Sequence, residues 1–248
     1  MASFPYRLTG PIGTKATLGL IVLQVDETVE QDFRRAFALP DVALHISRIP
    51  SGAELTPDTI AAMEAELPRA AALLPPAAAF DAVGYACTSG TTLIGAQRVA
   101  SLVSGSVNTR AVSNPLTASV AALQAVNARS IAIVSPYIAS VADSVSATFG
   151  AHGFDVRNTI SFGEEIEARV ARIDPQSIHD AAMQAGRTEG AEAVFLSCTN
   201  LRTFDIIDDL ENRLGMPVIS SNQALIWHMA RSAGAPLTAQ APGGLFRL

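Results

Sequence analysis

Two cysteines, Cys87 and Cys198, are the residues of this 248-residue chain whose type and setting best suit chemistry. Each follows a short apolar segment and precedes a threonine and a second polar residue. A cysteine between a strand and the start of a helix lies beside unpaired backbone N–H groups, so we expect the pKa of each thiol to fall. A thiolate near neutral pH can act as a nucleophile or as a base.

The polar residues after the two cysteines predict a binding site for a carboxylate. Backbone N–H groups at the start of a helix, together with hydroxyl and amide side chains, suit an anion. The side chains expected to contact the substrate in this way are those of Thr88, Ser89, Thr199 and Asn200. Two such loops predict a small substrate held between them.

The two cysteine loops belong to an internal repeat. Segment 81–89 (DAVGYACTS) matches segment 192–200 (EAVFLSCTN), since each has an acidic residue, an apolar strand and then Cys-Thr-polar. Two further pairs of segments match in the same order, 17–22 with 130–135 and 112–114 with 220–222. Three matched pairs predict two copies of one structural unit, related by an approximate twofold axis.

Short apolar runs alternate along the chain with alanine-rich stretches of helical periodicity, a pattern typical of parallel sheets covered by helices. The predicted strands span residues 17–25, 42–49, 82–87, 109–113, 129–135, 155–161, 191–197 and 216–220. The predicted helices span residues 28–38, 57–74, 91–102, 116–126, 138–150, 175–186, 203–213 and 223–233. The fold class is therefore predicted to be α/β.

The repeat and this alternation together predict two pseudo-symmetric lobes, each a flavodoxin-like or Rossmann-like α/β unit with a parallel sheet. Residues 1–114 and 223–248 form the first predicted lobe, and residues 115–222 form the second. Ligands of open α/β sheets bind at the carboxyl ends of the strands, where both cysteine loops are placed. We therefore expect one active site in the cleft between the lobes.

Composition narrows the classes of partner. Apolar residues make up 49% of the chain, charged residues only 16%, and the formal net charge is −6, so a nucleic-acid partner is not expected. The apolar runs are shorter than the roughly 20 residues that cross a bilayer, and residues 1–13 do not resemble a signal peptide, which together predict a cytoplasmic protein without a membrane partner. The four histidines lack ligand spacing, so no metal is expected.

Five short stretches carry a resemblance to a known family. They are Ile21-Val22, Cys87-Thr88-Ser89-Gly90-Thr91, Ser135-Pro136-Tyr137, Ala171-Arg172-Ile173-Asp174-Pro175 and Leu196-Ser197-Cys198-Thr199-Asn200-Leu201-Arg202-Thr203. With them the chain resembles the Asp/Glu racemase superfamily. Within it, the chain is similar to the branch that holds maleate cis-trans isomerases, arylmalonate decarboxylases and the ectoine-utilisation protein EutA.

The resemblance implies a cofactor-independent isomerase or racemase of a small carboxylate. It assigns Cys87 as the nucleophile or base, Cys198 as the acid/base partner, and Tyr137 as a hydroxyl donor to a carboxylate or enolate oxygen. A thiolate either adds to an alkene carbon and allows rotation, or removes an α-proton that the other thiol replaces on the opposite face. One alternative is an arylmalonate decarboxylase-like lyase, which is disfavoured because the resemblance implies that such enzymes keep only the second of the two cysteines. Another alternative is a non-catalytic relative that binds a small carboxylate. The alanine-rich helices suit a homo-oligomer.

One departure from the resemblance concerns charge. After the first strand, the resemblance implies the motif Pro-Ser-Ser-Asn in maleate isomerases. This chain has Leu23-Gln24-Val25-Asp26 at that place, so a carboxylate replaces an amide. Asp26 either caps the following helix or contacts a cationic group on the substrate, and the second reading favours the ectoine-utilisation branch. The acidic run 163–167 is also near a position where the family places an amide, but we expect its glutamates to cap a helix at the surface.

Overall fold

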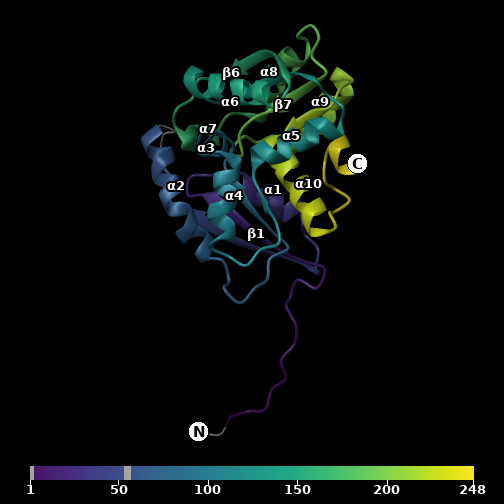
Figure 1. The fold of residues 1–248 in the computed structure, drawn as a ribbon. Coiled ribbons are helices and arrows are strands. Elements are labelled where there is room, and N and C mark those ends of the chain that lie inside the picture. The colour runs from purple at the N-terminus through teal and green to yellow at the C-terminus, as the bar shows by residue number, and fades with distance from the viewer. Residues whose placement is uncertain (1–2, 53–56) are drawn as a thin grey trace.

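The computed structural model describes residues 3–52 and 57–248, and it contains two parallel four-stranded sheets (Figure 1). The first sheet has the order β2-β1-β3-β4, with β1 (Ala16–Leu23), β2 (Val42–Ile49), β3 (Ala82–Ala86) and β4 (Val112–Ser113). The second has the order β6-β5-β7-β8, with β5 (Ser130–Ser135), β6 (Asp155–Ser161), β7 (Ala193–Leu196) and β8 (Val218–Ser220). The identical order confirms the predicted pair of similar parallel units.

Helices cover both sheets near the places that the periodicity predicts, and the short helix over Glu167–Val170 is an additional one that was not predicted. They are α1 (Val29–Ala36), α2 (Pro57–Ala72), α3 (Thr88–Ile94), α4 (Ala96–Ser104), α5 (Pro115–Ala125), α6 (Ala139–Ala151), α7 (Glu167–Val170), α8 (Pro175–Gly186), α9 (Ile207–Leu214) and α10 (Ser221–Ala233). The single helix predicted over 91–102 is instead two helices, α3 and α4. The chain turns between them at Gly95, whose φ of +94° is a conformation that favours glycine.

The acidic residue that opens each repeat has the same structural task in both sheets. Asp81 Oδ2 accepts a hydrogen bond from the backbone N–H of Thr17 at the start of β1 (2.9 Å). Glu192 Oε2 accepts one from the N–H of Ser130 at the start of β5 (3.0 Å). Each carboxylate therefore fixes the beginning of the central strand that neighbours it, which gives the sequence repeat a physical meaning.

Two helices link the sheets. Helix α10 follows β8 of the second sheet but also packs against β1 and β3 of the first, while α5 follows β4 of the first sheet and contacts both α10 and β8. A single apolar core consequently runs from Leu20 in β1 through Met229 in α10 to Phe195 in β7. The division into 1–114 with 223–248 and 115–222 stays a prediction.

Residues 3–12 are exposed and extend away from the body of the molecule (Figure 1). Within residues 3–52 and 57–248, no helix combines the length and apolar character needed to cross a membrane.

The close approach of α10 to β3 depends on Gly84. A Cβ atom at this position would lie 2.5 Å from the sulfur of Met229 and 3.2 Å from a methyl carbon of Leu20. Both neighbours are fully buried, so they have little room to move.

We expect Gly84→Ala to destabilise the fold by about 1–3 kcal/mol, because the added methyl group overpacks the junction of α10 and β3. The matched control is Gly150→Ala on the exposed side of α6, where a Cβ atom meets nothing within 4 Å. That variant should keep its stability or gain up to about 1 kcal/mol. Urea denaturation of both variants measures the difference, and equal stabilities would contradict the packing argument.

Candidate active site

Cys87 begins α3 as its N-cap residue. The Sγ atom accepts a hydrogen bond from the backbone N–H of Gly90 (3.2 Å) and lies 3.8 Å from the hydroxyl of Ser89. The Thr91 hydroxyl donates to the Cys87 carbonyl oxygen (2.6 Å). The prediction that a helix starts beside this cysteine is confirmed, and the helix begins three residues earlier than the predicted start at 91.

Cys198 has a different backbone setting. Its φ of +149° is unusual for a residue with a side chain and costs about 1–3 kcal/mol, so the surrounding structure must hold it in place. The Sγ atom accepts a hydrogen bond from the N–H of Asn200 (3.4 Å). The next helical turn starts at Phe204, close to the predicted start at 203, so Cys198 does not lie at a helix N-terminus as Cys87 does.

Ser221, the first residue of α10, joins the two cysteine loops. Its Oγ atom accepts hydrogen bonds from the Thr88 hydroxyl (2.9 Å) and from the backbone N–H of Cys198 (3.2 Å). A second link runs from the Thr199 hydroxyl to the carbonyl oxygen of Ala86 (3.3 Å), the residue before Cys87. The structure therefore brings the two predicted loops together at the junction of the sheets.

A tyrosine lies beside each cysteine. The Tyr137 hydroxyl is a hydrogen-bond partner of the Cys198 thiol and is close enough to Cys87 for the two groups to interact electrostatically. The Tyr85 hydroxyl lies next to the Cys87 thiol. Burial raises the pKa of both phenols well above its ordinary value, so both remain protonated donors at neutral pH. Tyr137 was predicted from the sequence, whereas Tyr85 was not.

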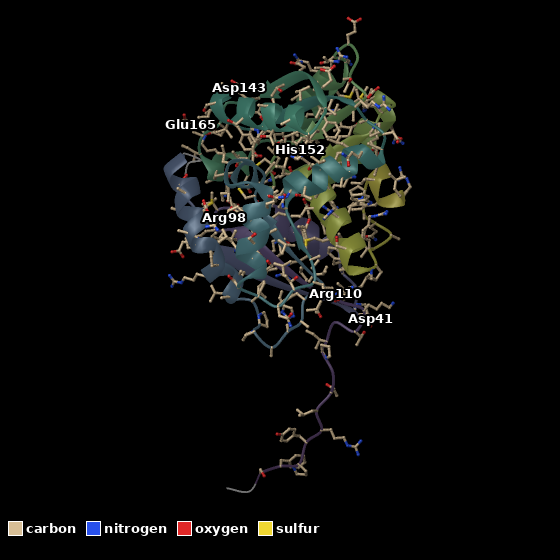
Figure 2. All side chains as sticks on the ribbon, in the orientation of Figure 1. Asp41, Arg98, Arg110, Asp143, His152 and Glu165 are labelled. Carbon is tan, nitrogen blue, oxygen red and sulfur yellow. The ribbon has the colours of Figure 1, made fainter. Side chains whose placement is uncertain are left out.

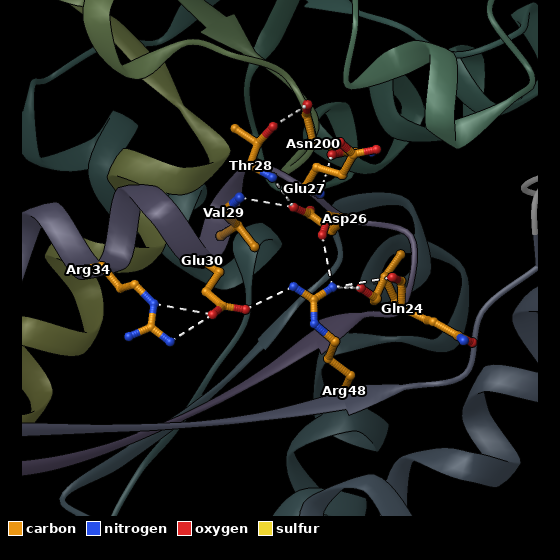
Figure 3. A network of polar contacts seen from close by, with 10 residues as sticks. Gln24, Asp26, Glu27, Thr28, Val29, Glu30, Arg34, Arg48 and Asn200 are labelled. Carbon is orange, nitrogen blue, oxygen red and sulfur yellow. Dashed lines mark hydrogen bonds and ion pairs between the residues drawn. The ribbon is translucent and has the colours of Figure 1, made fainter.

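Asp26 caps α1. Its Oδ1 atom accepts hydrogen bonds from the backbone N–H groups of Thr28 (2.8 Å) and Val29 (2.9 Å), as Figure 3 shows. Oδ1 of Asp26 therefore has the capping role, while a contact of Asp26 with a cationic group on the substrate stays a prediction. Nη1 of Arg48 donates to the carbonyl oxygen of Asp26 (2.9 Å), and Nη2 forms an ion pair with Glu30 (2.9 Å), so the guanidinium holds the loop from outside.

Asn200 fastens the Asp26 loop to the second cysteine loop. Its Oδ1 atom accepts from the N–H of Glu27 (2.9 Å), and its carbonyl oxygen accepts from the Thr28 hydroxyl (2.9 Å; Figure 3). Its Nδ2 atom donates to Oε2 of Glu167 and to the Glu167 carbonyl oxygen, both at 3.1 Å. The Asn200 side chain is thus engaged by protein groups, and its contact with a substrate stays a prediction.

Glu167 is buried, with 4% of its surface exposed, and the expectation of a surface helix cap was wrong for this residue. It starts the short helix α7, whose N-terminal turn faces Asn200 and the cysteines. Burial, and to a smaller extent the nearby charge of Asp26, raises the pKa of the Glu167 carboxyl to about 7, against the lowering effect of the Asn200 hydrogen bond. The sequence offered one signal that Glu167 could belong to the site, namely its loose match to a position where the family has an amide. The neighbouring glutamates made this match hard to assign to one residue.

The predicted fall in the thiol pKa values was wrong for this structure. Burial raises the pKa of Cys87 to about 12 and that of Cys198 well above its ordinary range, and the charge of Glu167 raises both. The hydrogen bonds from Gly90 and Asn200 lower them by less. The rise in thiol pKa caused by the loss of water around the sulfurs is therefore larger than the fall caused by the backbone N–H groups.

Asp32 and Asn222 lie beneath the cysteine loops. Asn222 Nδ2 donates to Asp32 Oδ2 (2.8 Å) and to the carbonyl oxygen of Thr199 (2.9 Å). Burial raises the pKa of Asp32 to about 7. Sequence reasoning missed this acid, although it lies on the apolar face of α1 with Val29 and Phe33, a placement that signals a buried carboxyl. In the part of the chain that the structure describes, no three His, Cys, Asp or Glu side chains form a metal-binding group.

Two similar parallel sheets whose cysteine loops meet at one junction define a two-lobed α/β protein with a paired-thiol site. The model of the arylmalonate decarboxylase family matches residues 105–246, which is more than half of the chain. The chain therefore belongs to the arylmalonate decarboxylase family.

Curated relatives come from two groups of enzymes. The arylmalonate decarboxylase of Bordetella bronchiseptica is 31% identical over 128 residues, which are 51% of this chain and 53% of that protein. The maleate isomerase of Nocardia farcinica is 25% identical over 240 residues, 93% of this chain and 95% of that protein. The likeness to maleate isomerase thus extends over both cysteine loops.

The solved structures include a cysteine-to-serine mutant of Nocardia farcinica maleate cis-trans isomerase with a covalently bound succinylcysteine intermediate. It superposes with a TM-score of 0.85 at 24% identity, over 94% of this chain and 98% of that chain. This likeness confirms the α/β fold with two parallel sheets.

The raised pKa of Asp32 predicts a pH dependence of stability. The folded protein keeps this proton up to about pH 7, whereas the unfolded chain releases it near the ordinary aspartate value of 3.8, so the folded state binds more protons between these values. The free energy of unfolding should therefore fall as the pH rises from about 4 to about 7. Asp32→Asn should flatten this slope in urea titrations, while Asp143→Asn, at an exposed site, should preserve it. A slope that survives Asp32→Asn unchanged would contradict the assignment.

The charge of Glu167 should be visible in the reactivity of the thiols. Glu167→Gln removes a charge that raises the pKa of both cysteines and keeps an oxygen that can accept from Asn200, so the pKa values should fall. The pH profile of iodoacetamide labelling, followed by mass spectrometry, should then move to lower pH. Glu165→Gln, two residues away and exposed, is the control. A profile that moves equally in both variants would show that Glu167 does not act on the thiols.

Proposed function

We propose that this protein is a cofactor-independent isomerase of a small carboxylate that works with two cysteines. The observation that carries the proposal is the meeting of Cys87 and Cys198, from matched loops of two sheets, on Ser221. Tyr137 is within electrostatic reach of both thiols. The likeness to maleate isomerases over nearly the whole chain supports an isomerase of the Asp/Glu racemase superfamily.

In the cis–trans form of the reaction, the Cys87 thiolate adds to one carbon of a double bond. A carbon–sulfur bond forms, and the neighbouring carbon takes a proton from Cys198. The former double bond is then single and can rotate. Cys198 takes the proton back as the carbon–sulfur bond breaks, which restores the double bond and the Cys87 thiolate. The Tyr137 hydroxyl donates a hydrogen bond to the carboxylate oxygen on which charge develops.

In the racemase form, one thiolate removes the α-proton of a carboxylate and the other thiol returns a proton on the opposite face. In both forms, the substrate carboxylate is held by Thr88, Ser89 and Thr199 together with backbone N–H groups of the two loops.

Three further predictions belong to this proposal. They are a place in ectoine utilisation of the EutA kind, a cytoplasmic location and a homo-oligomeric state.

A carbon–carbon lyase of arylmalonate decarboxylase type is the alternative. The family model and the decarboxylase relative favour it, because the family match covers Cys198 and leaves Cys87 outside. The two thiols favour the isomerase. A decarboxylation needs only one thiol as the proton donor, so Cys87 would have no chemical role in it. Release of carbon dioxide from an arylmalonate would identify the lyase.

Trapping of the covalent intermediate tests the proposal. Cys198→Ser should accumulate an adduct of one substrate molecule on Cys87, because the serine hydroxyl or water can still supply the proton to the neighbouring carbon, whereas serine cannot remove it again efficiently. Intact-mass spectrometry and peptide mapping after incubation with maleate, maleamate or cis-4-aminobut-2-enoate measure the adduct. Nuclear magnetic resonance in deuterated water measures α-proton exchange of amino acids for the racemase form.

The matched control is Cys87→Ser, which should form no adduct and lose activity by several orders of magnitude. The isomerase proposal fails if wild-type protein neither isomerises nor exchanges any of these compounds and Cys198→Ser carries no adduct.

A further inference from the structure

Asp26 has a buried carboxylate oxygen without a partner. Its Oδ1 atom is used by the α1 cap, but its Oδ2 atom receives no hydrogen bond from the described residues, although only 2% of Asp26 is exposed. The Thr199 hydroxyl lies close enough to this carboxyl to lower its pKa, but the hydrogen bond with good geometry that it donates goes to the carbonyl oxygen of Ala86 (3.3 Å). A buried carboxylate oxygen that lacks a donor is costly, so its persistence at the cysteine loops points to a donor supplied by a ligand.

Glu167 reaches the same place from the second sheet. Asp26 and Glu167 interact electrostatically with each other, and both act on the Cys198 thiol. The charge of Glu167 also raises the pKa of Cys87 and of Tyr137, so its carboxyl lies near both thiols and the phenol. The side chain that donates a hydrogen bond to Glu167 is the neutral amide of Asn200, which does not offset the charge of the Glu167 carboxylate.

Two described arginines near these acids direct their hydrogen bonds and ion pairs to other groups, although the charge of Arg48 also lowers the pKa of Asp26. Arg48 donates to the carbonyl oxygens of the Asp26 loop and pairs with Glu30 (Figure 3). Arg35, which faces Asp32, pairs with Asp205 (2.6 Å). Acidic side chains therefore lie near the same thiols that accept hydrogen bonds from backbone N–H groups of the cysteine loops.

From this arrangement we infer that Asp26 and Glu167 determine specificity for a zwitterionic substrate, with its carboxylate on the cysteine loops and a protonated nitrogen, ammonium or amidinium, between the two acids. The inference rests on the proposed function and names its substrate class. A substrate with two carboxylates, such as maleate, would place its second negative charge against Asp26 and Glu167 and is disfavoured.

The thiols give this charge pattern a chemical consequence. The charge of Glu167 raises the pKa of both cysteines, and that of Asp26 raises the pKa of Cys198. A cation between the acids offsets these charges and favours the thiolate, whereas a dicarboxylate opposes it. The zwitterion thereby helps to create the nucleophile that attacks it.

Two saturated acids of similar length separate this inference from catalysis. Isothermal titration of the wild-type chain with 4-aminobutanoate, a zwitterion, and succinate, a dianion, measures binding that needs no turnover. We expect the zwitterion to bind at least about tenfold tighter, which corresponds to about 1.4 kcal/mol. Asp26→Asn keeps the cap, and Glu167→Gln keeps the Asn200 contact, so both variants should fold and should lower this preference about tenfold. The double variant should prefer succinate.

Glu165→Gln is the matched control, because this exposed side chain lies at the outer edge of the same region (Figure 2) and should leave the preference unchanged. Wild-type preference for succinate, no detectable binding of 4-aminobutanoate at millimolar concentration, or an unchanged ratio in both acid variants would overturn the inference. These outcomes are distinct from failure of the proposed function, which shows as absent turnover and an absent Cys87 adduct and leaves the binding ratio measurable.

Discussion

The relative position of the two cysteine loops depends on the hydrogen bonds that the Ser221 hydroxyl accepts. This hydroxyl accepts hydrogen bonds from one cysteine loop through Thr88 and from the other through the backbone of Cys198. Ser221 can do so because α10 leaves the second sheet and packs on the first, where Gly84 permits the close approach of Met229. The packing of one helix thus fixes the distance and orientation of two loops that are far apart in the sequence.

Electrostatics of the junction follow from its burial. Asp26 and Glu167, whose pKa values are raised, lie near thiols whose own pKa values are raised, and the raised Asp32 is linked to the second cysteine loop through Asn222. Each of these groups prefers its neutral form when water is removed, and each disfavours the charge of its neighbours. Burial therefore keeps both thiols protonated at neutral pH. A charge that comes close to Asp26 and Glu167 would change the pKa of the thiols through the same interactions.

Much of the fold could be read from local pattern. The eight strands and the order of the helices follow from apolar runs and helical periodicity, which need only neighbouring residues. The one helix predicted over 91–102 was divided because Gly95 takes a positive φ, and the pattern of apolar residues does not register such a turn. The Cys-Thr-polar loops also identified the site, since a repeat places both loops at equivalent strand ends.

By itself, the sequence determined two α/β units, two thiols at matched strand ends and an acid at position 26. Tertiary structure alone decided that Glu167 is buried beside the thiols and that Ser221 joins the loops, because these contacts connect residues distant in the chain. It also reversed the expected direction of the thiol pKa shifts. A helix N-terminus is visible in sequence, but the loss of water that opposes it depends on every segment packed around the sulfur.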